Sequence, residues 1–153
     1  MNSLDKKSPI RRFKSFRWEE TEVLAYKEEG SAPFKAITRQ TLFRDPDLKC
    51  ELRYFEVSPG GYSTLERHEH MHAVLILRGR GECLVGGQVR AVDTNDLVTI
   101  EHWTWHQFRA GPDAPLGFLC MVNAERDKAS LPTDVERKAL ESDPKVAAFL
   151  KGA

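Results

Sequence analysis

Short runs of alternating apolar and polar residues fill the middle of the chain, and residues that favour turns separate them. Between Phe34 and Val122 these runs are rich in β-branched and aromatic side chains. The last run, Leu116–Val122, is almost wholly apolar, which is typical of a strand buried on both faces or lining a barrel. The pattern predicts an all-β sandwich or jelly roll. The predicted strands cover residues 34–43, 50–57, 66–77, a hairpin over 82–92 with its turn at 86–87, 97–100, a stretch from 106 onward and 116–122, with a further turn at 58–61.

The residues before this series show no clean period. Residues 1–12 are polar and basic, which indicates a flexible arm. In the segment that follows, up to residue 29, Phe13, Phe16 and Trp18 are scattered among charged residues. We expect this aromatic segment to pack across the outside of the barrel or against a second subunit.

The residues after the last strand carry helix signals. Thr133 followed by Glu136 is a capping box, and Pro144 suits the first turn of a second helix that ends at Gly152. We expect one or two short helices over an end of the barrel. The chain then divides into an N-terminal extension over residues 1–30, a barrel over 31–124 and a helical tail over 125–153.

One stretch, GGYSTLERHEHMHAVLILRGRG from Gly60 to Gly81, concentrates side chains that bind metals. Glu66, His68, His70 and His72 stand at every second position, so in an extended strand all four point to one side. Three imidazoles and a carboxylate on one face make a poor core and a good set of ligands. The pattern predicts a metal site on this strand.

The spacing resembles the first motif of the cupin family, in which a glycine is followed by His-x-His, a glutamate and a second glycine. Two residues are exchanged here, because Glu66 takes the place of the first histidine and His72 that of the glutamate. The histidine of the second cupin motif corresponds to His106 in DLVTIEHWTWHQF, although other residues of that motif differ. The resemblance covers Leu52 to Val122. It implies a cupin-type jelly-roll barrel with four metal ligands, namely Glu66, His68, His72 and His106.

His70 is ambiguous within this set. It could replace Glu66 as a ligand, carry protons near neutral pH, or cap the mouth of the barrel. A site of imidazoles and one carboxylate suits manganese, which we expect, or Fe, Ni, Co or Zn, whereas Ca and Mg prefer more oxygen. Four ligands on an octahedral ion leave two positions for a carbonyl and a hydroxyl of a substrate. The remaining positive charge would favour an enolate, so proton abstraction next to a carbonyl is the step best supported.

The chain has three cysteines and no CxxC pair, which fits a reducing compartment. Cys120 lies in the apolar strand after the His106 strand, where an inward-facing thiol would sit near the metal. The alternative for Cys120 is a small buried hydrophobe. Cys50 and Cys83 are better explained by packing.

Three stretches, ERHEHMHAVLILRGRG, TWHQFRA and PLGFLCMVNAERD, together resemble a subgroup of small single-domain cupins that includes the methylthioxylulose-phosphate methylsulfurylases. The resemblance implies a methylthio-substituted ketose phosphate as substrate and Cys120 as the nucleophile that attacks the thioether sulfur. A deoxyketose phosphate and a mixed disulfide would result, and an external thiol such as glutathione would reduce the disulfide. Arg39 and Arg109 are candidate phosphate contacts, because arginine forks suit phosphate.

Two other functions remain open on the sequence. A cupin dioxygenase, or an isomerase of sugars or sugar phosphates, would use the same four ligands without a cysteine. A non-catalytic cupin would bind a metal or a ligand only, although no helix-turn-helix pattern supports a regulator.

The size and charge of the chain limit the classes of partner that it is expected to bind. At 153 residues with 41% hydrophobic content the chain is one domain. Lys plus Arg and Asp plus Glu both number 23, so no net charge favours nucleic acid or an anionic membrane. No apolar run approaches the roughly 20 residues needed to span a bilayer, and MNSLDKKSPIRRF lacks the apolar segment of a secretory signal. We expect a cytoplasmic protein that acts on a small molecule and pairs as a homodimer through exposed strands.

Overall fold

A computed structural model describes residues 9–152 of the chain. Within this range the strands are β1 (Phe13–Lys14), β2 (Arg17–Trp18), β3 (Leu24–Ala25), β4 (Lys35–Asp45), β5 (Cys50–Tyr62), β6 (His72–Val85), β7 (Gln88–Asp93), β8 (Leu97–Ile100), β9 (His106–Ala110) and β10 (Leu116–Asn123). Two helices follow, α1 (Asp134–Leu140) and α2 (Pro144–Lys151).

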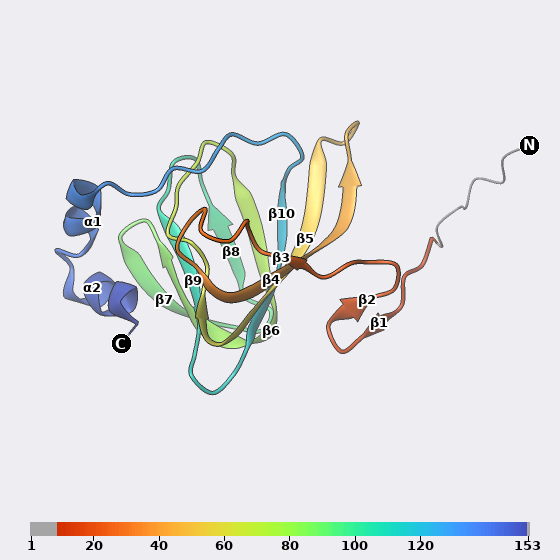
Figure 1. The fold of residues 1–153 in the computed structure, drawn as a ribbon, viewed down its shortest axis with the longest axis horizontal. Helices are drawn as coiled ribbons and strands as arrows, with labels where there is room; N and C mark the ends of the chain where they lie inside the picture. The colour runs from red at the N-terminus through yellow and green to blue at the C-terminus, as the bar shows by residue number, and fades with distance from the viewer. Residues whose placement is uncertain (1–8, 153) are drawn as a thin grey trace, which may run out of the picture.

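Four antiparallel strands close a barrel. β5 pairs with β10, β10 with β6 and β6 with β9, and β9 returns to β5 where Arg109 lies opposite Tyr62. β4 flanks β5, while β7 and β8 pair with the two halves of β6 (Figure 1). The interior is filled by apolar side chains from these strands, among them Val57, Ile76, Phe108 and Phe118. The predicted all-β barrel is confirmed.

Strand β5 is longer than the sequence pattern indicates. It continues through residues 58–61, which were predicted to form a turn. Gly60 adopts a positive φ of 73°, and a Cβ on Gly61 would lie 2.6 Å from the carbonyl oxygen of Lys35. The register between β4 and β5 shifts between Lys35 and Ile37. The glycines therefore allow a local irregularity within strand β5, because without side chains they let the backbones of β4 and β5 come close.

The predicted strand over residues 66–77 is wrong in its first half. β6 begins only at His72, and Glu66 and Arg67 form isolated bridges, Glu66 with His106 and Arg67 with Ser130. The backbone of Glu66 exchanges two hydrogen bonds with that of His106, at 3.2 and 3.0 Å. Two-residue spacing of the histidines thus does not mean a common strand face. The segment before β6 is a loop held against β9.

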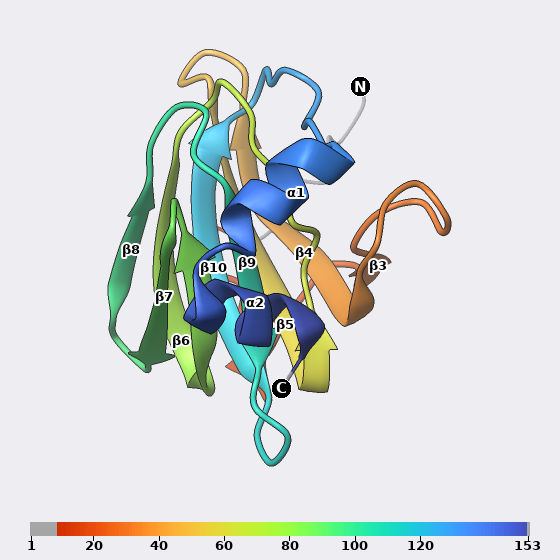
Figure 2. The ribbon, with the colours of Figure 1, turned by 90° about the vertical axis from the view of Figure 1, so that its left-hand side faces the viewer.

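The capping box of α1 and the end of α2 at Gly152 are as the sequence predicts, and Asp143 is a further cap. Thr133 and Glu136 form the capping box of α1, Asp143 caps α2, and Gly152 ends α2 with φ 76°. The helices do not cover an end of the barrel. They lie against the outside of its wall (Figure 2), where a second apolar cluster forms. That cluster contains Leu65, Leu84, Val146, Phe149 and Leu150. No helix in residues 9–152 is long and apolar enough to cross a bilayer.

In the N-terminal extension, the β1–β2 hairpin lies on the side of the barrel away from the helices, whereas the segment with β3 runs across the barrel (Figure 1). β1 and β2 form a hairpin whose Phe16 and Trp18 rings lie 6.0 and 5.2 Å from the ring of Tyr54 on β5. β3 pairs with β4. Packing across the barrel is therefore the observed arrangement. Residues 1–8 of the predicted flexible arm lie outside the described residues, whereas Arg11 donates to Thr21 at 2.9 Å.

Candidate metal centre and active site

Three imidazoles converge inside the barrel. His68 comes from the loop before β6, His72 opens β6 and His106 opens β9, and one ring nitrogen of each lies within 4.8 Å of the others. The bridge between Glu66 and His106 and the pairing of His72 with Ile100 fix the backbones that carry them. These three residues are brought together as expected for a shared ligand set.

Backbone carbonyls orient the rings. Nδ1 of His68 lies 2.8 Å from the carbonyl oxygen of His70, and Nδ1 of His106 lies 2.9 Å from that of Thr104. Because a carbonyl oxygen can only accept, each Nδ1 carries the proton and each Nε2 presents a lone pair. Nε2 of His68 is 2.8 Å from Nε2 of His72.

Burial keeps these imidazoles neutral. Burial, with His106 and His70 nearby, lowers the pKa of His68 to about 4. Burial also lowers the pKa of His72 and that of His106. Neutral imidazoles with lone pairs aimed at one point are the state that a transition metal requires. The donor set therefore fits a divalent transition metal.

Glu66 lines the same cavity but does not join the imidazole cluster. Its carboxylate pairs with Lys27, which the N-terminal extension supplies. Of the four expected ligands, three are therefore grouped, and the fourth is paired with a lysine beside them. Lys27 is a site residue that the sequence did not indicate.

His70 belongs to a second group. Its ring stacks on His68 with centroids 3.6 Å apart, and its Nδ1 lies 2.6 Å from Oδ1 of Asp127. Asp127 also accepts from the backbone N–H groups of Glu69 and His70, at 2.9 and 3.1 Å. One ligand atom from each of His68, His70 and Asp127 lies within 4.8 Å of the others. Asp127 thus fixes the orientation of His70 behind the three converging imidazoles.

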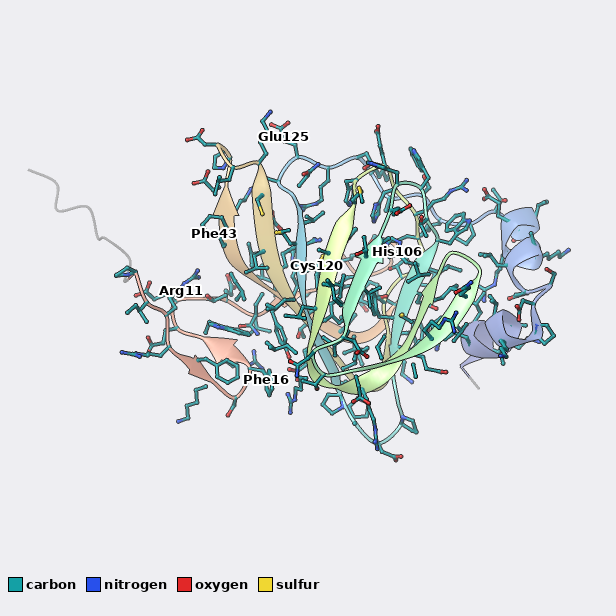
Figure 3. All side chains as sticks on the ribbon, turned by 180° about the vertical axis from the view of Figure 1, so that it is seen from behind. Arg11, Phe16, Phe43, His106, Cys120 and Glu125 are labelled. Atoms are coloured by element: carbon teal, nitrogen blue, oxygen red, sulfur yellow. The ribbon has the colours of Figure 1, made fainter. Side chains whose placement is uncertain are left out.

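Cys120 contacts one of the three imidazoles, that of His72. Figure 3 labels Cys120 and His106 on the strands of the barrel. It is buried on β10, with Sγ 3.0 Å from Nδ1 of His72 and 3.6 Å from the guanidinium of Arg53. Strand register explains the contacts, since Cys120 stands opposite Arg53 on β5 and Val74 on β6. Burial raises the pKa of the thiol, and the charge of Arg53 opposes that shift.

A cavity of about 170 Å³ connects these groups. Its polar lining includes His72, His106, Glu66 and Cys120. Five apolar side chains form another part of its wall, namely Phe55, Val74, Ile100, Phe108 and Phe118. Four polar residues that the sequence did not single out also line it, Tyr26, Lys27, Arg53 and Ser63, as does the expected Arg39.

Arg109 lies elsewhere. It lines a separate cavity of about 260 Å³ beneath the C-terminal helices. Its guanidinium stands over the rings of Tyr62 and Phe149 and donates to the carbonyl of Leu150 at 3.1 Å. This placement argues against a contact between Arg109 and a molecule bound beside Cys120.

Comparison with known proteins shows which family the chain resembles. The profile of a family described as Cupin domain matches residues 53–122. The 1-methylthio-D-xylulose 5-phosphate methylsulfurylase of Rhodospirillum rubrum is 61% identical over 145 residues, which cover 94% of this chain and 93% of that protein. The chain belongs to the cupin family. The matched residues of this cupin include the three imidazoles and Cys120, but not Lys27 or Arg39.

Solved cupins have the same barrel. A cupin-2 domain from Rhodospirillum rubrum is 61% identical and superposes with a TM-score of 0.85, covering 94% of this chain and 97% of that one. A cupin 2 conserved barrel domain protein from Rhodopseudomonas palustris is 52% identical with a TM-score of 0.86, covering 92% of this chain and 97% of that one. The similarity extends beyond the matched family profile to most of this cupin.

Proposed function

We propose that this cupin is a metal-dependent enzyme that cleaves the C–S bond of a 1-methylthio ketose phosphate, as the name of its Rhodospirillum rubrum relative suggests. One contact supports this proposal above others. Sγ of Cys120 lies 3.0 Å from Nδ1 of His72, so a sulfur nucleophile adjoins the candidate metal ligands.

His68, His72 and His106 would hold the ion, and Glu66, or His70 in its place, would complete the set. We expect manganese, with Fe, Ni, Co and Zn as alternatives. A bound divalent ion supplies positive charge that stabilises an enolate of the substrate. With Nε2 of His72 engaged as a ligand, the remaining proton of that ring is on Nδ1 and faces Sγ of Cys120. His72 and Arg53 would then both favour the thiolate.

The thiolate of Cys120 attacks the sulfur of the methylthio group. The bond between that sulfur and C1 breaks, and its electron pair stays on C1, where the adjacent carbonyl delocalises it as an enolate. A proton added at C1 gives the deoxyketose phosphate. Cys120 keeps the methylthio group as a mixed disulfide, and an external thiol such as glutathione reduces it and restores the thiol.

Mass spectrometry of the protein tests this sequence of steps. After reaction with 1-methylthio-D-xylulose 5-phosphate without added thiol, we expect one methylthio group on Cys120 that glutathione removes. Cys50→Ser should leave the adduct and turnover unchanged, whereas Cys120→Ser should abolish both while retaining bound metal. Full activity of Cys120→Ser would refute the thiol mechanism and favour a cupin dioxygenase or a sugar-phosphate isomerase. Metal-free protein with unchanged ligand binding would favour a non-catalytic cupin.

A homodimer remains a prediction. Three exposed apolar side chains, Leu75, Leu97 and Met121, lie on the paired strands β6, β8 and β10, which supports association through this outer face. The aromatic side chains Phe16 and Trp18 instead pack on Tyr54 of their own chain. Sedimentation of the wild type and of Leu97→Glu would test the dimer.

A further inference from the structure

Positive charge is in excess on one wall of the inner cavity. Lys27, Arg39 and Arg53 line it, and Glu66 is the acidic residue in its lining. Glu66 is paired with Lys27. The two arginines therefore face the cavity without a carboxylate among its lining residues to balance them.

The carboxylate that pairs with Arg53 is already shared. Glu51 is buried, and its oxygens lie 3.7 Å from Arg44, 3.6 Å from Arg53 and 3.3 Å from Arg126. The distance to Arg53 is too long for a hydrogen bond. One carboxylate thus pairs with three guanidinium groups, and it is also the carboxylate whose charge acts on Arg39, which forms no ion pair within residues 9–152.

Both cavity arginines keep an unused donor. Nε of Arg39 and Nε of Arg53 are buried and lack a hydrogen-bond partner among the described residues. Burial, and then the nearby charge of Arg53, lowers the pKa of Arg39. Buried donors of a charged group are costly to leave unpaired, and two guanidinium groups that repel each other are stabilised by an anion placed between them.

Strand pairing places this wall beside the reactive groups. Arg39 lies opposite Phe55 on β5, so Arg39 and Arg53 are diagonal neighbours on the inner face of the sheet. Arg53 contacts Cys120, and Cys120 contacts His72. The cationic wall and the imidazoles thus lie on the two sides of the thiol.

We propose that Arg39 and Arg53 form a phosphate-binding site inside the barrel, which receives the phosphate monoester of the substrate. Its assignment to the substrate rests on the proposed function, whereas the anion site itself rests on the two arginines. Guanidinium forks match the oxygens of a phosphate dianion and supply the negative charge that this wall lacks. A phosphate held there fixes one end of the substrate while its carbonyl end faces the imidazoles, so the site selects phosphorylated ketoses over free sugars.

Calorimetric titration of the metal-loaded protein with inorganic phosphate tests the site. We expect Arg39→Gln and Arg53→Gln each to weaken phosphate binding by about tenfold or more, because each removes a charge-assisted fork. Arg39→Lys keeps the charge but not the fork, and should give an intermediate loss. Arg44→Gln is the matched control, since Arg44 also pairs with Glu51 but is exposed and does not line the cavity. It should bind phosphate as the wild type does.

Thermal melting checks that each variant is folded. If Arg53→Gln does not fold, Arg39→Gln alone still tests the site. Competition with D-xylulose 5-phosphate and with D-xylulose supplies a second readout, because only the phosphorylated sugar should lose affinity in the variants. Phosphate binding that is absent from the wild type, or unchanged in both variants because the metal holds the anion, would overturn the site. Turnover with an unchanged KM in both variants would also refute it while the proposed function stands. Arginine-dependent phosphate binding without turnover of the methylthio substrate would refute the proposed function and leave the anion site intact.

Discussion

Strand β9 separates two cavities, and its successive residues face one or the other. His106 and Phe108 line the cavity inside the barrel, while Gln107 and Arg109 line the cavity beneath the C-terminal helices. Both cavities contain arginines, and the outer one is larger, at about 260 against about 170 Å³. Only the inner one also contains converging imidazoles and a thiol in contact with them. Neither volume nor arginine content therefore distinguishes the candidate site from the outer cavity.

The arginines of the two cavities also differ in what they contact. Among the described residues, Nε of Arg109 has no hydrogen-bond partner, and the same holds for Nε of Arg39 and Nε of Arg53. Arg109, however, lies over two aromatic rings and binds the last turn of α2 through Leu150. Its role is to attach the helix to the barrel. The comparison teaches that the contacts of an arginine, and not its residue type, separate one that is available to a ligand from one that is structural.

The strongest test of this comparison uses adjacent residues of β9. His106→Ala should abolish stoichiometric metal binding and with it turnover, by roughly a thousandfold or more, because it removes one of three converging imidazoles. Gln107 faces the other cavity, so Gln107→Ala should retain the metal. Loss of the hydrogen bond from Gln107 to the carbonyl of Ser63 should lower the free energy of unfolding by about 1 kcal/mol. Metal content by elemental analysis and kcat would be measured for both. Equal metal loss in the two variants would show that the faces of β9 are not functionally distinct.

A smaller effect distinguishes the candidates for the fourth ligand. We expect Glu66→Gln to weaken metal affinity by roughly tenfold or more, because it removes the carboxylate that lines the inner cavity. His70→Ala should weaken it less, since His70 lies behind His68 and is held by Asp127. Competition with a metal chelator gives both affinities. The reverse order would assign the fourth position to His70.

The smallest expected effect concerns the outer cavity. Arg109→Ala should lower the free energy of unfolding by about 1 to 2 kcal/mol, because it removes the contact with Leu150 and the stacking on Tyr62. Its kcat and KM should stay within about twofold of the wild type. Arg137→Ala, which breaks an exposed pair with Glu141 on α1, should cost only about 0.5 kcal/mol. Urea denaturation would give both values, and a fall in kcat for Arg109→Ala would place that residue in the reaction.

The barrel and the helix ends could be predicted because their signals are local. Alternation along a strand, glycines at the turn of residues 86–87 and the cap at Thr133 each depend on neighbouring residues only. The path of residues 63–71 could not be predicted in this way. Histidines two apart fit a strand and a loop equally well, and the bonds that decide between them go to His106, far along the chain.

The same reason explains the site residues that sequence analysis missed. Lys27 reaches Glu66 across thirty-nine positions, and Asp127 reaches His70 across fifty-seven, so neither contact has a local signal. Arg53 is different. It shares the inner face of β5 with Phe55 and Val57, and that parity was available in CELRYFEV. A charged residue in phase with buried apolar ones was the signal that could have identified it.

The lysine supplied from before the first long strand has an evolutionary consequence. Tyr26 and Lys27 reach the inner cavity from a segment that the matched family profile does not include. If the inner cavity binds substrate, exchanging that segment between relatives changes the cavity lining and leaves the barrel strands unaltered. Chimeras that transplant only the first thirty residues would show whether new cupin activities arise from appended sequence.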